Sequence, residues 1–370
     1  MTSPPVQPSG AADAPRRRRA WRFGAPAFLA SVALVALAGF AVALALPADR
    51  YLRFQQLDDT QQYRARWIYE RIHFDPTPID IAILGPSRTL YGVNAPLLEK
   101  ALAARGYGGL HAANLSLPDP GFDLTKALAE EVVAYKHPKV VIVGATEQLS
   151  RRGHPAFKDL ADVDDLVTAP VVGNRFYFEN LVRAAYRQIQ IAAIGLDPAF
   201  FGYDRGFDPA RYARIPADTT FDERLPDGHV VDHTSIRTEA FLDADRAKFV
   251  RGIQPPLLHG RLFPVEFSIS LDGYAGVARA AHSSGAQLYF LYQGYFKGPQ
   301  QPQEQGFYQG LGPVIPANWG SGDYRLFSDS RHRNRPGAAV LTQGLADWLA
   351  SRWRARGAPA TNRSGDGHDA

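Results

Sequence analysis

Short apolar runs and amphipathic segments follow one another along the chain in a regular order. The runs "IDIAILG" (79–85), "LHAANLSLP" (110–118) and "HPKVVIVGATEQ" (137–148) resemble strands buried on both faces of a parallel sheet. Between them, residues 94–106 and 123–136 carry apolar side chains at intervals of three and four, which predicts helices. This order predicts an α/β protein with a mostly parallel sheet and helices on its faces.

The pattern breaks after the third run and resumes near residue 271. The interval contains one clear amphipathic segment, 176–195, and a polar stretch rich in Pro and Gly, 200–260, without a steady period. We predict an α/β domain over 76–355 with an insertion at about 149–262, which shapes a substrate surface or packs against a partner. The domain resumes with a helix, a strand and a final helix, at 271–285, 286–295 and 337–355.

An uncharged segment, "GAPAFLASVALVALAGFAVALALP" (24–47), precedes the domain and is long enough to cross a bilayer as a helix. The residues before this segment include five arginines and one aspartate, and this excess of four positive charges equals the net charge of the whole chain, +4. The positive-inside rule then predicts a single-pass anchor in the inner (cytoplasmic) membrane, with a cytoplasmic N-terminus and an extracytoplasmic, periplasmic domain. A cleaved signal peptide is the alternative. We predict a linker helix at 48–75 and disordered tails at 1–23 and 356–370.

Composition excludes several kinds of site. The chain beyond the basic tail is formally neutral, so it lacks the basic face that nucleic acid requires. The absence of cysteine excludes disulfides, thiolate metal sites and cysteine nucleophiles. His229 and His233 have a spacing that binds zinc on a helix, but Pro226 and Gly228 disfavour a helix there, and a polar loop is favoured. We expect no metal and no cofactor.

Two short motifs indicate acyl chemistry. Ser87 follows the first predicted strand, at the sheet edge where ligands bind in parallel α/β folds, although alone it would be read as a helix cap. Asp329 and His332 precede the last helix. At this spacing the carboxylate can accept a hydrogen bond from the imidazole and stabilise the imidazolium that forms when His332 takes a proton from a serine.

These motifs resemble those of the SGNH (GDSL-type) hydrolase superfamily. The sequence Gly85-Pro86-Ser87-Arg88 resembles the Gly-x-Ser-Arg of a membrane-anchored branch that includes alginate and teichoic-acid acylation proteins, and the closing motif Asp-x-x-His-x-Asn-x-x-Gly is present at 329–337. The resemblance covers about 76–150 and 264–352. It implies a three-layer α/β/α sandwich of the flavodoxin-like type, with Ser87 as nucleophile, His332 as general base and Asp329 as its orienting carboxylate.

The resemblance also implies an oxyanion site. The Ser87 backbone N–H would be one donor, because backbone donors are free at a helix start. Gly121, after the second strand, is the expected second donor, with Ser116 or the Asp119 backbone as alternatives.

The family's third donor is an Asn after the third strand, and here the chain departs from the pattern. It reads Gly-Ala-Thr-Glu at 144–147, so the Thr146 hydroxyl is the expected replacement and Glu147 is expected to be a solvated loop acid. Arg88 and Asn114 complete the expected substrate site.

The function implied by the resemblance is that of a membrane-anchored serine esterase or O-acyltransferase, acting on acyl, chiefly acetyl, esters of a cell-envelope or exported polysaccharide. The expected partners are the bilayer, through 24–47, a glycan substrate and a membrane acyltransferase. Aromatic residues in 289–308 suit sugar stacking, but strand core is the favoured interpretation. The alternative is a catalytically inactive SGNH-like protein for glycan binding or envelope complex assembly, which the altered third block and the insertion favour.

Overall fold

A five-stranded sheet forms the centre of the domain, and all of its strands run parallel. The computed structural model describes residues 24–226, 228 and 230–356. The strand order is β2-β1-β3-β6-β7, with β1 (Ile81–Leu84), β2 (Ala112–Asn114), β3 (Val140–Ala145), β6 (Gln287–Tyr292) and β7 (Val314–Pro316). The α/β class and the parallel sheet are confirmed. The sequence pattern missed β7, because three residues that end in Pro carry no periodic signal.

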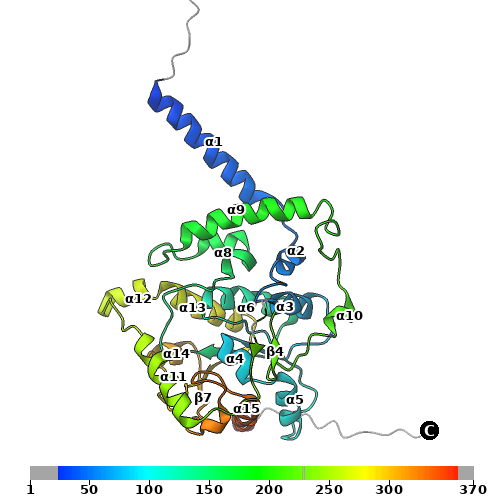
Figure 1. Cartoon of the computed structure of the whole chain (residues 1–370), viewed down its shortest axis with the longest axis vertical. Coiled ribbons are helices and arrows are strands. Elements are labelled where there is room, and N and C mark those ends of the chain that lie inside the picture. Colours follow the sequence, from blue (N-terminus) through cyan, green and yellow to red (C-terminus); the bar gives the residue numbers. More distant parts are fainter. Residues whose placement is uncertain (1–23, 227, 229, 357–370) are drawn as a thin grey trace, which may run out of the picture.

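Helices cover both faces of this sheet (Figure 1). In β1, Ile81 and Ile83 pack with α5 (Ala95–Ala103) and α15 (Arg335–Ala355), whereas Ala82 and Leu84 belong to a second cluster. That second cluster includes the apolar sides of α6 (Phe122–Lys136) and α13 (Ser268–Ser283). Because successive strand residues point to opposite faces, the continuous apolar runs supply both clusters at once.

A tight turn joins β1 to the short helix α4 (Ser87–Gly92). Gly85 has a φ of +152°, and a Cβ there would lie 2.6 Å from the Thr89 hydroxyl oxygen. A Cβ at Gly144, near the end of β3, would lie even closer to the same hydroxyl. The two glycines therefore let α4 begin directly against the neighbouring strand, which fixes Ser87 at the carboxyl edge of the sheet.

The segment 48–75 forms two helices, α2 (Arg50–Gln55) and α3 (Arg64–His73), rather than one linker helix. The polar residues between the two helices form turns, and both helices contribute buried side chains to the domain core. The fully buried Glu70 accepts hydrogen bonds from Tyr51 at 2.5 Å and from Arg66 at 3.3 Å, and forms an ion pair with Arg211 of the insertion. This segment is therefore packed into the domain, which its helical spacing alone did not reveal.

The insertion is more ordered than its sequence pattern predicts. The amphipathic segment 176–195 forms α9 (Tyr177–Ile194), as predicted. The stretch 200–260, which shows no period, contains a β-hairpin and a fourteen-residue helix, α11 (Glu239–Gly252). The remaining short elements of the insertion are α7 (Phe157–Leu160), α8 (Val163–Thr168), α10 (Pro209–Tyr212), β4 (Glu223–Arg224), β5 (Val230–Val231) and the 3-10 turn Gly260–Leu262. The short elements that follow the insertion are α12 (Phe263–Glu266), α14 (Gln305–Leu311) and the 3-10 turn Tyr324–Leu326.

The first helix, α1 (Ala25–Ala45), extends away from the domain (Figure 1). It is long and apolar enough to cross a membrane, and its most apolar window is unburied. The predicted tails at 1–23 and 356–370 lie outside the described residues, apart from Arg356, which follows α15.

Candidate active site

The three residues predicted to form a catalytic triad lie together at the carboxyl edge of the sheet. Ser87 Oγ lies 2.9 Å from His332 Nε2, although 245 positions separate the two residues in the chain. His332 Nδ1 lies 2.8 Å from Asp329 Oδ2. The chain of contacts runs from hydroxyl to imidazole to carboxylate, which is the arrangement that lets a serine hydroxyl lose its proton as it attacks.

The loop that carries Asp329 and His332 is held by local hydrogen bonds. Asp329 Oδ1 accepts the backbone N–H groups of Arg331 and His332 at 2.7 and 2.8 Å. Asn334 then caps α15, because its side chain accepts the Gly337 N–H at 3.0 Å and donates to the Arg325 carbonyl at 2.8 Å. The Asn and Gly of the closing motif therefore shape the loop that presents His332.

The carboxylate of this triad is held in its charged form. Burial alone would raise the pKa of Asp329, but the adjacent His332 and the two backbone N–H donors lower that pKa well below its usual value. Asp329 can therefore orient the imidazole and stabilise its protonated form at any ordinary pH.

The triad opens into a cavity of about 480 Å³. One wall comes from the β4–β5 hairpin of the insertion, through Leu225, Val230 and Val231. The segment that follows β2, at 118–120, also lines the cavity. The insertion therefore supplies part of the surface around Ser87.

His233 and Tyr91 also line this cavity, and sequence reasoning assigned neither to the catalytic site. The Tyr91 ring contacts both histidines, with centroids 4.3 Å from His233 and 5.9 Å from His332. The His233 side chain is buried, and neither ring nitrogen has a hydrogen-bond partner. Burial and the nearby His332 lower the pKa of His233 to about 4, so its imidazole is neutral near pH 7. Tyr91 follows Ser87 by one helical turn, which is the one signal in the sequence that places it there.

The zinc interpretation finds no support at His233. Asp227 and His229 lie outside the described residues. Within residues 24–226, 228 and 230–356, no cluster of three or more His, Asp or Glu side chains is suited to a metal ion. His233 instead packs against an aromatic ring, and its backbone N–H donates to Asp222 at 2.6 Å.

Two expected oxyanion donors are engaged elsewhere. The Thr146 hydroxyl donates to the Gln148 carbonyl at 2.7 Å, and Thr146 does not line the cavity. Gly121 packs closely against the His154 backbone, where no Cβ would fit, and it also lies outside the cavity lining. The Asp119 backbone, named above as an alternative, does line the cavity and has a left-handed φ of 72°.

Arg88 and Glu147 form an ion pair instead of facing the cavity. The guanidinium Nη1 and Nη2 atoms lie 2.6 and 2.8 Å from the two carboxylate oxygens of Glu147. Burial would raise the pKa of Glu147, but the Arg88 charge outweighs it and lowers this pKa. Glu147 is therefore a largely buried partner of Arg88, and the expectation of a solvated loop acid is wrong.

The Asn114 side chain also has a structural role. Its buried side-chain amide donates to the carbonyls of Thr89, Leu90 and Val93, at 3.1, 3.1 and 2.8 Å. These carbonyls belong to the last turn and the end of α4; the Thr89 carbonyl also accepts the Val93 N–H, and the carbonyls that follow it lack partners within the helix. Asn114 therefore fixes the helix that carries Ser87, and it does not line the cavity.

The aromatic residues of 289–308 contribute mainly to packing. Tyr289, Phe290, Tyr292, Phe296 and Tyr308 are buried, as the favoured interpretation of the sequence predicted.

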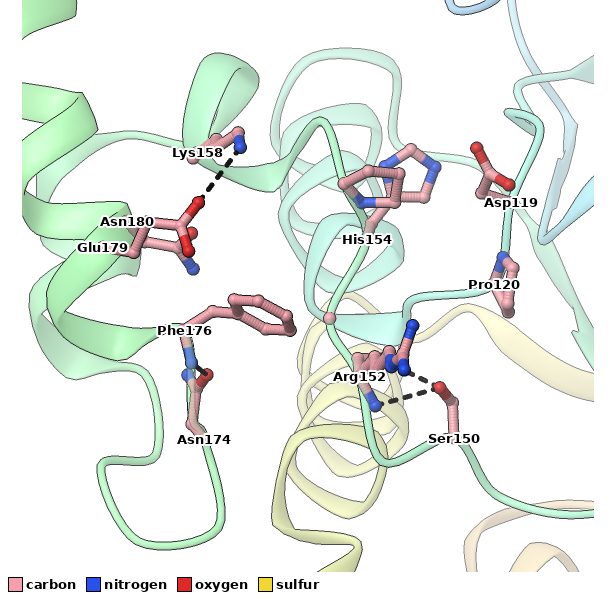
Figure 2. A pocket seen from close by; sticks show the side chains of 12 residues that line it. Asp119, Pro120, Ser150, Arg152, His154, Lys158, Asn174, Phe176, Glu179 and Asn180 are labelled. Carbon is pink, nitrogen blue, oxygen red and sulfur yellow. Dashed lines mark hydrogen bonds and ion pairs between the residues drawn. The ribbon is translucent and has the colours of Figure 1, made fainter. Parts of the chain in front are cut away.

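A second cavity, of about 340 Å³, adjoins the first (Figure 2). Asp119 and Pro120 line both cavities. Figure 2 shows the remaining walls, which come from the segment after β3, with Arg152 and His154, and from the start of α9, with Phe176. The two cavities together offer an extended polar surface that begins at Ser87.

No family model matches the chain, and no curated protein matches it in sequence. The geometry of the site is therefore the basis for assigning a function.

Proposed function

We propose that this chain is a membrane-anchored serine esterase or O-acyltransferase of the SGNH type, which acts on acyl, chiefly acetyl, esters of an extracytoplasmic polysaccharide. The observation that carries the proposal is the hydrogen-bonded series Ser87–His332–Asp329 at the carboxyl edge of a parallel sheet. The same series, with a cavity around the serine, satisfies the geometric test for a nucleophile and its base.

The chemistry would run in two steps. Ser87 Oγ attacks the ester carbonyl while His332 Nε2 takes the hydroxyl proton, and His332 then donates this proton to the departing sugar oxygen. This leaves an acyl-Ser87 ester. In the second step His332 removes a proton from water or from a sugar hydroxyl, whose oxygen attacks the acyl group. His332 then returns the proton to Ser87 Oγ as the acyl–Ser87 bond breaks. Hydrolysis and transfer therefore share one site and differ in the acceptor.

Two backbone groups are the best candidates to stabilise the oxyanion. Ser87 is the first residue of α4, so its N–H has no carbonyl partner within that helix. Asp119 also lines the cavity, in a turn held by Gln61 and Gln62, whose side chains donate to the Asp119 carboxylate at 2.9 and 3.2 Å, and its backbone N–H is the second candidate. Removal of one oxyanion donor typically costs about 3 kcal/mol in transition-state stabilisation.

The fold and the neighbouring cavity support the same assignment. The strand order β2-β1-β3-β6-β7 equals the flavodoxin-like order 2-1-3-4-5 when the five strands are numbered by themselves, and we infer the three-layer α/β/α arrangement of SGNH proteins from it. The polar second cavity is suited to a chain of sugar rings that continues beyond the reacting ester. The apolar helix α1 supports anchoring in the inner membrane, with the domain outside the cytoplasm.

The full-length protein in detergent provides the test. A fluorophosphonate probe should label it covalently, and Ser87→Ala should abolish this labelling and lower hydrolysis of an acetyl-ester dye by at least about a thousandfold. Ser351→Ala is the matched control, because Ser351 lies on the exposed surface of α15. Equal labelling of Ser87→Ala and the unchanged protein would refute the role of Ser87. Acetylated and unacetylated glycans then distinguish hydrolysis from transfer.

A non-catalytic glycan-binding role is the second candidate, since Thr146 and Glu147 replace the expected amide donor and both are engaged in other contacts. It predicts that glycan binding by Ser87→Ala equals that of the unchanged chain while neither protein reacts with the probe. Covalent labelling at Ser87 with turnover would reject this role.

A further inference from the structure

One face of α9 is apolar and uncovered. The exposed positions Phe178, Val182, Tyr186 and Ile189 are 72%, 62%, 52% and 51% accessible, and they recur at intervals of four, four and three residues. This spacing places all four on one side of the helix. Ala193 continues the same exposed row. Single exposed apolar side chains are common, but a continuous row along about four turns marks a contact surface.

The opposite face of α9 is fastened to the end of α1. The Gln188 side chain donates to the Leu46 carbonyl at 3.0 Å, directly after the last turn of α1. Ile191 and Ile194 form a buried cluster with Leu52, which follows α1 in the chain. The position of α9 is therefore tied to the point where α1 ends.

That point corresponds to the edge of a bilayer. The 21 residues of α1 span about 31 Å at the helical rise of about 1.5 Å per residue, close to the hydrocarbon thickness of about 30 Å. Figure 1 shows α9 lying across the domain end of α1, at the border of the domain from which α1 leaves. If α1 spans the membrane, α9 lies at the level of the lipid headgroups.

The loop after α9 continues the apolar surface. Leu196 and Phe200 are 87% and 80% accessible, and Phe201 is also exposed. Phenylalanine, tyrosine and aliphatic side chains of an amphipathic helix are the groups that insert at the boundary between headgroups and acyl chains.

We propose that α9 and the loop 196–201 form a second membrane contact, with the row Phe178–Val182–Tyr186–Ile189 inserted into the interface of the bilayer that α1 crosses. This inference rests on the proposed anchoring by α1 and is independent of the proposed catalysis. Two contacts, one spanning and one interfacial, would hold the domain in one orientation on the membrane, whereas a single helix leaves it free to tilt.

The absence of cysteine allows a direct test with the full-length chain, because one introduced thiol is labelled uniquely. We would label Val182→Cys and Tyr186→Cys with an environment-sensitive fluorophore in proteoliposomes of phosphatidylethanolamine and phosphatidylglycerol. The matched control is Val340→Cys, an exposed valine on α15 at the other end of the domain (Figure 1). Val35→Cys, on α1, reports the anchor.

Positions 182 and 186 should show a blue-shifted emission and several-fold quenching by nitroxide lipids, and position 340 should show neither. Water-like emission at 182 and 186, with position 35 quenched, overturns the interfacial contact but leaves the anchor intact. Water-like emission at position 35 as well removes the anchor and the inference with it. Blue-shifted emission that lipid nitroxides do not quench means that a protein surface covers α9, which also overturns the proposal.

Discussion

Acidification should destabilise the protein through His233, whose ring is buried beside Tyr91 without a hydrogen-bond partner. Burial first, and then the charge of His332, lowers the pKa of His233 from 6.5 to about 4. Asp222, Asp232 and Asp329 act in the opposite direction but do not outweigh burial. The folded protein therefore resists a proton that the unfolded chain accepts readily.

The sign and size of the effect follow from this difference. A histidine whose pKa is depressed by folding adds stability above pH 6.5, and this stability is lost as the pH falls toward 4. At about pH 5, protonation of His233 in the unfolded chain shifts the unfolding equilibrium by a factor of about 30, which corresponds to about 2 kcal/mol. The complete loss, at lower pH, is about 3 kcal/mol.

The assay is urea unfolding of the full-length protein in detergent at about pH 7.5 and pH 5. Variants His233→Phe and His233→Gln remove the titrating group but differ in packing and polarity. Both should lose about 2 kcal/mol less stability than the unchanged protein between these two pH values. Equal pH dependence in all three proteins would refute the reasoning, because it would mean that the His233 ring takes up a proton without leaving its buried site.

Four further substitutions test other parts of the site. Arg88→Ala and Glu147→Ala should each lower the free energy of unfolding by about 3 kcal/mol, since each leaves a buried charge without its partner. The double variant should lose clearly less than the sum of the two, and additive losses in a double-mutant cycle of denaturation would contradict the pairing. Asp329→Asn should lower kcat for an acetyl-ester dye by about ten-thousandfold with little change in KM, and an unchanged kcat would remove Asp329 from the mechanism. Asn114→Ala should destabilise the fold by about 3 kcal/mol through three lost hydrogen bonds, as measured by thermal unfolding, whereas a substrate contact would alter KM without this loss.

The sequence predicts the parts of the fold whose signal is local. Four of the five parallel strands appear in the sequence as continuous apolar runs, because strands covered on both faces need apolar residues at every position. The triad is also predictable, since the turn after β1 and the turn before α15 both lie at the carboxyl edge of one sheet. Neither Ser87 nor His332 alone indicates a triad. The order of the strands and helices around them does.

The remainder of the site depends on contacts that no local pattern encodes. Glu147 is read as a solvated acid because its partner, Arg88, lies 59 residues away. The β4–β5 hairpin has two residues in each strand, too few to show alternation. Such a short hairpin is not stable alone, so its place in the cavity wall depends on contacts with the rest of the domain. His233 belongs to this hairpin region, so its place beside Tyr91 follows from the fold and not from its neighbours in sequence.

The insertion also contacts both loops that carry the proposed triad. Phe249 of α11 lies under two guanidinium groups, 5.6 Å from Arg88, beside the nucleophile, and 5.5 Å from Arg331, beside the base. Asp245, one helical turn earlier, accepts the Ser330 backbone N–H at 2.9 Å. The insertion therefore contains both α9, the helix proposed to contact the bilayer, and α11, the helix that contacts both motif loops. Removal of the insertion should therefore abolish the alignment of Ser87 with His332, and not merely alter the choice of substrate.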